Sequence, residues 1–200
     1  MNAPPVVLAS ASAGRAAILT NAGVAFTVDA THVDEDAVKQ AMRGDGASAA
    51  DVAQALAELK AVRKSLQHPG ALVIGADQML DCDGEWFDKP AGASSARTQL
   101  EALSGRTHTL HSAVCVAREG AMIWHYRDRA DLTMRVLSED FLSRYFAEDE
   151  AALTGSVGGY RLEGKGAQLF NEIRGDYFSI LGLPLLPLLA FLREHGVLVA

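Results

Sequence analysis

Residues 71–76 read Ala-Leu-Val-Ile-Gly-Ala, and Asp77 follows them directly. Every position in this run is apolar, so both faces of the element must be covered by other parts of the protein. The pattern predicts a central strand over 71–76, with Asp77 at its carboxyl end. A carboxylate in such a poorly solvated place needs a cation, a metal or a hydrogen-bond network. The alternative interpretation is a structural carboxylate that caps a turn.

The clearest predicted helix precedes this strand and covers residues 49–67. Ser48 and Asp51 supply a start that resembles a capping box. Lys60 lies beside the apolar stripe of this helix, so we expect its side chain to reach past the packed face; an ordinary surface charge is the alternative. The large apolar residues that define the stripe recur at spacings of three and four: Val52, Leu56, Leu59, Val62 and Leu66.

The N-terminal segment has the pattern strand, small polar loop, helix. Residues 6–9 predict a short buried strand, and residues 16–19 predict a helix that ends near Gly23. Between them, residues 10–15 read Ser-Ala-Ser-Ala-Gly-Arg. Hydroxyls, small residues and a helix N-terminus favour an anion, and Arg15 adds a cation that can bind phosphate with two parallel hydrogen bonds. A serine-rich helix cap without a ligand is the alternative.

An acidic segment, Asp34-Glu35-Asp36, follows a second predicted strand at residues 26–29. Carboxylates together with substrate phosphates are the ligands that Mg²⁺ prefers. The segment is therefore a candidate metal site, although a solvated loop would have the same composition.

The rest of the chain predicts an α/β fold with a mixed sheet, because helices and strands interleave while two long strands follow one another across a tight turn. The predicted elements are a hairpin at Asp83-Gly84 that ends at Asp88-Lys89-Pro90, a helix over 93–103, strands over 107–117 and 122–136 joined at Glu119-Gly120, a helix capped by Ser138, a glycine-rich loop over 155–166, a hairpin around Gly175 and a helix from Pro184 to His195.

Composition limits the classes of protein and of partner. The 200 residues are 49% hydrophobic and suit one domain, 1–200, or two lobes that share a sheet. The net charge is -7 and Lys and Arg form no run, which argues against nucleic acid as a partner. A few local cations still suffice for one small anionic substrate.

The cellular setting is expected to be the cytoplasm. Cys82 and Cys115 have no zinc-type or disulfide-type spacing, and no signal-peptide pattern precedes the first strand. The most apolar stretch, residues 180–192, is broken by Pro184 and Pro187 and is too short to span a bilayer. We therefore expect no membrane partner.

Seven stretches, taken in order, resemble the Maf family of nucleoside triphosphate pyrophosphatases. Together they extend over nearly the whole chain, and their order matches the family. They are residues 8–15, the Lys60-Ala61 pair, residues 75–78, Asp88-Lys89-Pro90, residues 103–108, Glu163-Gly164-x-Gly166 and Gly182-Leu183-Pro184.

The resemblance implies a Maf/ITPase-like α/β fold whose mixed, twisted sheet forms two lobes around a cleft, and a homodimer. It implies hydrolysis of a nucleoside triphosphate to the monophosphate and pyrophosphate, with Mg²⁺ or Mn²⁺ as cofactor. It places Asp77 as proton acceptor or metal ligand, with Glu35 as a second metal ligand. The other matching positions are Lys60 and Lys89 for catalysis, and Ser10, Ser12, Gly14, Arg15, Gln78 and Glu163 for substrate binding.

Two positions bear on the nucleotide base. Gln78 and Glu163 resemble the branch of the family that acts on 7-methyl-GTP, whereas Gly14 matches neither that branch nor the dTTP/UTP branch. An ionised carboxylate only accepts hydrogen bonds, which suits the N1–H and N2–H donors of guanine. We therefore expect a guanine-type base. The alternatives are a dTTP/UTP pyrophosphatase, and a nucleotide-binding regulator of septum formation with little catalysis.

Overall fold

The structure, a computed structural model, describes residues 3–148 and 154–199, which divide into two compact units. Unit 1 consists of Met1–Gln78, Ser112–Asp128 and Gly182–Ala200, and unit 2 of Met79–His111 and Arg129–Leu181. Each unit is therefore assembled from segments that are distant in sequence.

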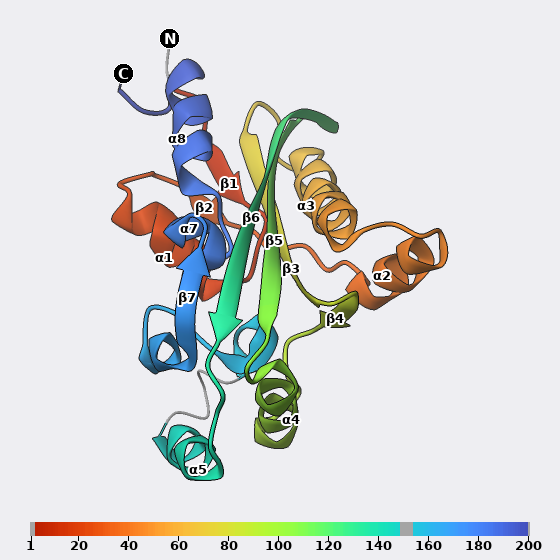
Figure 1. Ribbon diagram of the computed structural model, residues 1–200. Helices are drawn as coiled ribbons and strands as arrows, with labels where there is room; N and C mark the ends of the chain where they lie inside the picture. The colour runs from red at the N-terminus through yellow and green to blue at the C-terminus, as the bar shows by residue number, and fades with distance from the viewer. Residues whose placement is uncertain (1–2, 149–153, 200) are drawn as a thin grey trace. The chain divides into compact units, whose positions relative to one another are not determined.

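Strands of the described residues form one seven-stranded sheet in the order β2-β1-β3-β5-β6-β7, with β4 paired to β3 (Figure 1). Pairing is parallel between β1 and both of its neighbours, and antiparallel between β3 and β4 and between β6 and β7. The mixed α/β sheet expected from the sequence is confirmed. The strand bounds are β1 Val6–Leu8, β2 Thr27–Val28, β3 Leu72–Cys82, β4 Glu85–Phe87, β5 Thr107–Arg118, β6 Ala121–Met134 and β7 Phe170–Arg174.

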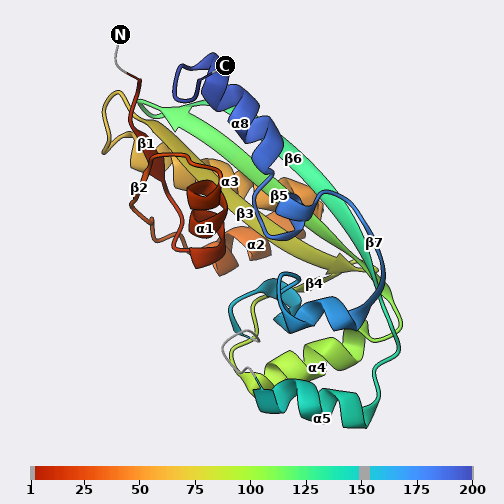
Figure 2. The same cartoon turned by 90° about the vertical axis from the view of Figure 1, so that its left-hand side faces the viewer.

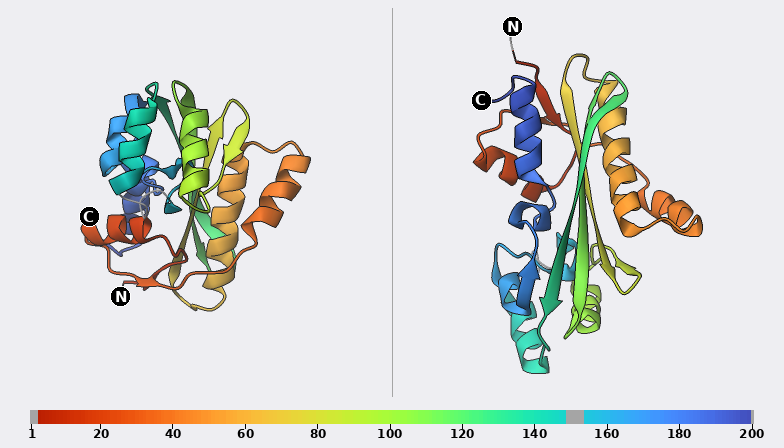
Figure 3. Two further views of the ribbon diagram at one scale, coloured as in Figure 1. Left: turned by 90° about the horizontal axis from the view of Figure 1, so that it is seen from below. Right: turned by 45° about the horizontal axis from the view of Figure 1, so that its top comes forward.

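In unit 1, helices cover both faces of the strands. Figures 1 and 3 show α3 on one face and α1 and α8 on the other. This double cover explains why residues 71–76 are apolar at every position, since all of them are buried. The helices of this unit are α1 Ala13–Asn21, α2 Glu35–Gly44, α3 Ala49–Ser65 and α8 Leu185–Glu194.

Unit 2 has its own apolar core, which is built mainly from β-strand residues and one face of α4. Leu100 and Leu103 of α4 and Leu132 of β6 are fully buried within it. Figure 2 shows α4 and α5 side by side. The helical elements here are α4 Ala93–Leu103, α5 Glu139–Glu148, the 3₁₀ turns η1 Val157–Gly159 and η2 Lys165–Leu169, and the short helix α7 Tyr177–Ile180.

Two tight turns are confirmed where the sequence predicts them. Asp83 and Gly84 between β3 and β4 have φ values of 55° and 85°, and Glu119 and Gly120 between β5 and β6 have values of 52° and 82°. Positive φ at both central residues is the geometry whose twist matches that of the flanking strands.

Two sequence expectations about strands are wrong. β3 continues from Leu72 to Cys82, so Asp77 lies in the middle of the strand rather than at its carboxyl end. The hairpin expected around Gly175 is absent from the described residues, because β7 ends at Arg174 and α7 begins at Tyr177. The Asp176 side chain accepts a hydrogen bond of 2.9 Å from the Ser179 amide and so starts a helix where a return strand was expected.

Cys82 and Cys115 are both free and buried. Among residues 3–148 and 154–199, no helix has the length and apolarity that crossing a membrane requires.

Candidate active site

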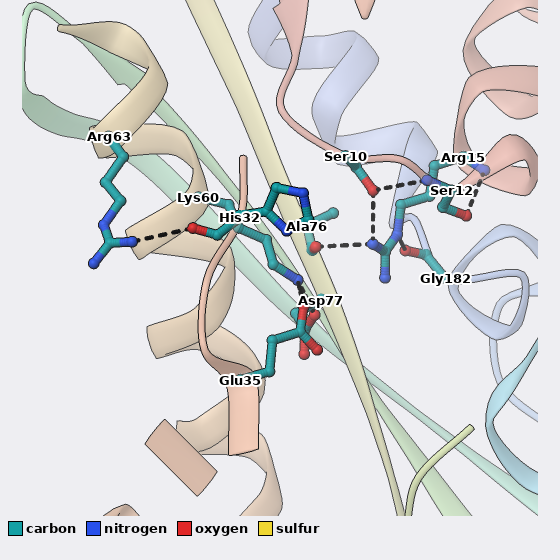
Figure 4. Close-up of polar contacts among 10 residues, drawn as sticks. All are labelled: Ser10, Ser12, Arg15, His32, Glu35, Lys60, Arg63, Ala76, Asp77 and Gly182. Carbon is teal, nitrogen blue, oxygen red and sulfur yellow. Dashed lines mark hydrogen bonds and ion pairs between the residues drawn. The ribbon is translucent and has the colours of Figure 1, made fainter. Parts of the chain in front are cut away.

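The candidate active site of unit 1 is centred on Asp77, a residue that is only 6% exposed. Its Oδ1 accepts a hydrogen bond of 2.6 Å from Nζ of Lys60, and both side chains are 8% exposed (Figure 4). A buried charge is costly unless it is paired, and the ion pair with Lys60 meets this requirement for Asp77 in the middle of its strand. The interpretation of Asp77 as a turn cap is wrong, since β3 continues past it.

Lys60 lies on the buried face of α3, not beside it as the pattern of large apolar residues predicts. The stripe that faces the sheet includes small residues, and Leu66 of the predicted stripe is 67% exposed. Alanines let the helix backbone approach the strands closely, so the helix is rotated from the orientation that its large side chains alone suggest. The buried positions are Ala49, Val52, Ala53, Leu56, Ala57, Lys60, Ala61 and Ser65.

Gly75 allows this close approach. A Cβ atom at position 75 would lie 2.1 Å from the carbonyl oxygen of Ala57 and 2.7 Å from the amide nitrogen of Ala61. Residues 75 and 77 point to the same face of β3, because strand side chains alternate. The glycine therefore lets α3 lie directly on β3, which brings Lys60 within hydrogen-bond distance of Asp77.

Glu35 supplies a second carboxylate to the same ammonium group. Its Oε1 lies 2.5 Å from Nζ of Lys60, and its side chain is 41% exposed. Glu35 is the first residue of α2, and Asp34 is the N-cap, whose side chain accepts a hydrogen bond of 3.0 Å from the Ala37 amide. The acidic segment is thus a helix start rather than a simple solvated loop.

Burial controls the protonation of Asp77. Removal from water raises the pKa of the Asp77 carboxyl group, and the nearby charges of Lys60 and Arg15 oppose that rise. Perturbed carboxylates with an identified charge partner are typical of functional sites, although structural ion pairs also produce them.

Asp77 and Glu35 are the two oxygen donors that face a common cation in this cluster. Among the described residues, no group of three or more His, Cys, Asp or Glu side chains is arranged to hold a metal ion. Mg²⁺ commonly takes only one or two protein carboxylates and completes its shell with water and substrate phosphates. The donor set therefore fits a metal that binds together with a phosphate substrate rather than one held by protein side chains alone.

The loop before α1 is organised by Arg15. Its guanidinium donates from Nε to the Gly182 carbonyl at 2.9 Å, and from one terminal nitrogen to the Ala76 carbonyl at 2.9 Å and to Ser10 Oγ at 3.0 Å. All three acceptors are neutral oxygens, so they orient the cation without cancelling its charge. Burial lowers the pKa of Arg15, while the charges of Asp77 and Glu35 oppose that change.

Ser12 is the N-cap of α1, and its Oγ accepts a hydrogen bond of 3.3 Å from the Arg15 amide. The Ser12 amide in turn donates to Ser10 Oγ at 3.3 Å. Gly14 is the second residue of α1, and a Cβ atom there would meet only Ser12 Oγ, at 3.7 Å. The helix N-terminus, the serines and Arg15 thus form the arrangement that favours an anion.

The loop before α1 and the carboxylate–lysine cluster are joined through β3. Figure 4 shows Arg15 with the serines on one side of the strand, and Lys60 with Glu35 on the other. The hydrogen bond from Arg15 reaches the Ala76 carbonyl, directly before Asp77. Unit 1 therefore holds the Arg15 cation of α1 against the carbonyl of Ala76 and carries the buried carboxylate at the next position of β3, Asp77.

Two parts of this site are not evident from residue types. Ser112, which is 2% exposed, accepts a hydrogen bond of 2.9 Å from the Gln78 side-chain amide. The Gly182 carbonyl holds Arg15 through a contact 167 positions apart in sequence. A buried serine at the start of an apolar run was the available signal for Ser112; the contact of Gly182 depends on tertiary structure.

Lys89 and Glu163, the other two expected site residues, belong to unit 2. Lys89 is exposed and follows β4, and Glu163 is exposed between η1 and η2. Their contribution to the site, and the cleft between lobes, stay predictions.

Known proteins resemble this chain over almost its whole length. A nucleoside triphosphate pyrophosphatase of Paramagnetospirillum magneticum is 58% identical over 193 residues, which are 96% of this chain and 100% of the relative. One of Rhodospirillum rubrum is 51% identical over 197 residues, 98% of each chain. A 7-methyl-GTP pyrophosphatase of Brucella abortus is 49% identical over 190 residues, 95% of this chain and 96% of the relative.

The family model described as Maf-like protein matches residues 5–195. This match includes every residue of the site described above. The resemblance drawn from the seven sequence stretches is thereby confirmed, and the chain belongs to the family of Maf-like proteins.

Proposed function

We propose that this chain hydrolyses nucleoside triphosphates to the monophosphate and pyrophosphate. The observation that carries the proposal is the buried Asp77, which is paired with Lys60 and directly follows the carbonyl that holds Arg15. The relatives at 58% and 51% identity bear the name of this activity.

The reaction breaks the anhydride bond between the α- and β-phosphates, and water supplies the new oxygen. Negative charge grows on the pyrophosphate that leaves, and a fixed guanidinium and an ammonium can stabilise it. Arg15 is held in place before the substrate arrives, so little reorganisation is needed. Its Nε and one terminal nitrogen are engaged by Gly182, Ala76 and Ser10, so the other terminal nitrogen is the part of the guanidinium that would donate to phosphate oxygens.

Asp77 is the group that would accept a proton from the attacking water, or would help to hold a metal ion that makes this water more acidic. Burial raises the pKa of this carboxyl group, which makes it a stronger base than an exposed aspartate. A bound Mg²⁺ or Mn²⁺ supplies charge neutralisation of the phosphates and a more acidic water. Glu35 and Asp77 are the residues that would hold this ion.

We propose further that guanine-type nucleotides, such as GTP and 7-methyl-GTP, are the preferred substrates. Glu163 carries this proposal, because a carboxylate accepts hydrogen bonds from N1–H and N2–H of guanine and cannot donate to the carbonyl oxygens of uracil or thymine. Relatives that are 49% identical are named for 7-methyl-GTP.

The test is pyrophosphate release by the full chain with GTP, 7-methyl-GTP, ATP, CTP, UTP and dTTP, with Mg²⁺, with Mn²⁺ and with excess chelator. We expect turnover only with a metal, and the highest kcat/KM for GTP or 7-methyl-GTP. Faster turnover of UTP and dTTP would reject the guanine preference, while the proposed hydrolysis to monophosphate and pyrophosphate would stand. Nucleotide binding without turnover of any member of the panel would reject the reaction and favour a regulator of cell division.

A further inference from the structure

The ammonium group of Lys60 lies between the two carboxylates that are expected to hold the metal. Nζ is 2.6 Å from Asp77 Oδ1 and 2.5 Å from Glu35 Oε1. Both Lys60 and Asp77 are buried, so little water is available to screen these charges. One cation already neutralises part of the charge of the pair.

A divalent ion and this ammonium group are competitors for the same oxygens. Two carboxylates and one ammonium carry a net charge of about -1, and a second cation beside the first would be repelled strongly in a medium of low dielectric constant. The ammonium therefore has to move before the carboxylates can bind a metal, and a displaced ammonium in a buried place needs another anion.

We propose that Lys60 is an internal counter-ion that keeps the metal site closed until a triphosphate arrives. In the nucleotide-free protein its ammonium holds Asp77 and Glu35 together. The triphosphate offers the ammonium new oxygens, so Lys60 turns to the phosphates while the two carboxylates bind the metal. Metal and nucleotide then bind cooperatively, because each needs the same movement of Lys60. This cooperativity does not depend on an unusually strong contact between the metal and the nucleotide. This inference rests on the proposed function, since it needs a triphosphate substrate.

The arrangement favours this exchange in two ways. Glu35 is 41% exposed and lies at the first residue of a helix, so the ammonium can leave from the solvent side of the pair. In contrast, Asp77 and the backbone of α3 are fixed by the close contact at Gly75. The exchange therefore requires movement of side chains and leaves the contact between α3 and β3 in place.

The first test measures Mn²⁺ binding to the nucleotide-free full chain by calorimetry. We expect Lys60→Met, which removes the charge and keeps much of the volume, to bind Mn²⁺ about tenfold or more tightly than the wild type. Lys60→Arg, which keeps a cation, should stay close to the wild type. Equal or weaker binding by Lys60→Met would contradict the proposal.

Lys64→Met is the matched control. Lys64 lies one turn further along α3 and is also paired with a carboxylate, since its Nζ is 2.7 Å from Asp29 Oδ1. Loss of this pair should leave Mn²⁺ affinity within about twofold of the wild type, because Lys64 is paired with neither Asp77 nor Glu35 and partly exposed charges interact only weakly at a distance. An equal gain in affinity in both variants would mean that net charge alone is responsible, and would overturn the proposal.

A second measurement uses the wild type, so it does not depend on whether a variant folds. The Nζ resonance of Lys60, assigned by its loss in Lys60→Arg, is followed by nuclear magnetic resonance. We expect it to keep its chemical shift with millimolar Mg²⁺ alone and to move when a non-hydrolysable GTP analogue is added with Mg²⁺. A resonance that moves with Mg²⁺ alone, or that never moves, would contradict the exchange.

The two proposals fail in different ways. If the wild type releases pyrophosphate but Lys60→Met shows no gain in Mn²⁺ affinity, the counter-ion role is wrong and the proposed function stands. If no nucleotide is turned over while Lys60→Met binds Mn²⁺ more tightly, the reaction is wrong and the competition between lysine and metal remains.

Discussion

Gly75 of β3 and Ala57 of α3 are in backbone contact, so close that a Cβ atom at position 75 would lie 2.1 Å from the Ala57 carbonyl oxygen. Lys60 is three residues after Ala57, and Asp77 is two residues after Gly75. Because both steps stay on one face of their element, the contact sets the distance between the ammonium and the carboxylate. A packing detail of the sheet thus determines the geometry of the candidate site.

Gly75→Ala should damage both activity and stability. The added methyl group must push α3 away from β3, and overpacking of this kind costs about 1–3 kcal/mol of unfolding free energy. We expect kcat to fall by about tenfold or more at a temperature where the variant is still folded, as checked by circular dichroism and a pyrophosphate assay.

Gly44→Ala is the control for that substitution. Gly44 is the last residue of α2, and a Cβ atom there would meet nothing within 4 Å. Activity should be unchanged and stability equal or slightly higher, because alanine favours a helix. Full activity in Gly75→Ala would show that the contact does not control the site.

Glu163→Gln should change the choice of base rather than the reaction. A glutamine side chain can both donate and accept, so it loses the advantage for guanine and can donate to a uracil carbonyl oxygen. We expect the ratio of kcat/KM for GTP over UTP to fall by about tenfold, a typical effect of one recognition hydrogen bond.

Glu172→Gln makes the same chemical change at another exposed site in unit 2. Glu172 forms an exposed ion pair of 2.8 Å with Arg174, two positions further along β7, so its loss should leave the ratio unaltered. Identical ratios in the wild type and Glu163→Gln would remove Glu163 from base recognition.

The stability of the protein should decrease on acidification through His108. Burial lowers the pKa of this histidine to about 4, and its Nε2 shares a hydrogen bond of 2.7 Å with the Tyr160 hydroxyl group. The unfolded chain binds a proton near pH 6.5 and the folded chain does not, so stability is complete above about 6.5 and is lost as the pH falls toward 4. Between pH 7 and pH 5 the expected loss of unfolding free energy from this group is about 2 kcal/mol.

Urea denaturation at pH 7 and pH 5 measures this effect. His108→Gln should show a smaller difference between the two pH values, whereas replacement of the exposed His125 by glutamine should keep the wild-type difference. An unchanged difference in His108→Gln would exclude His108 as its origin.

Local patterns predicted much of the fold. The capping box at Ser48 and Asp51, the glycine turns and the bounds of α4 all follow from interactions within a few residues. The hairpin around Gly175 failed because Asp176 can start a helix as well as follow a turn. Whether such a segment forms a hairpin or starts a helix depends on tertiary packing, which the spacing of residues does not reveal.

The candidate site was predictable in its residue types but not in its geometry. The apolar run of residues 71–76 predicts that Asp77 is poorly solvated, but it does not predict that Lys60 of α3 is the cation that neutralises it in the middle of β3. The stripe of large apolar residues puts Lys60 beside the packed face, because that stripe leaves out the alanines that pack against the sheet. Small side chains decide how closely two backbones approach, and their effect depends on the partner element.

The most direct measurement of the central claim is pyrophosphate release by Asp77→Asn compared with the wild type under saturating GTP and Mg²⁺. Asp81→Asn is the matched control, since Asp81 lies on the same strand and accepts a hydrogen bond of 3.2 Å from the Gly84 amide. We expect Asp77→Asn to lose activity by about 10²–10⁴-fold, the usual contribution of a positioned acid or base, while Asp81→Asn stays within about twofold of the wild type. Wild-type turnover in a folded Asp77→Asn protein would contradict a catalytic role for the buried carboxylate.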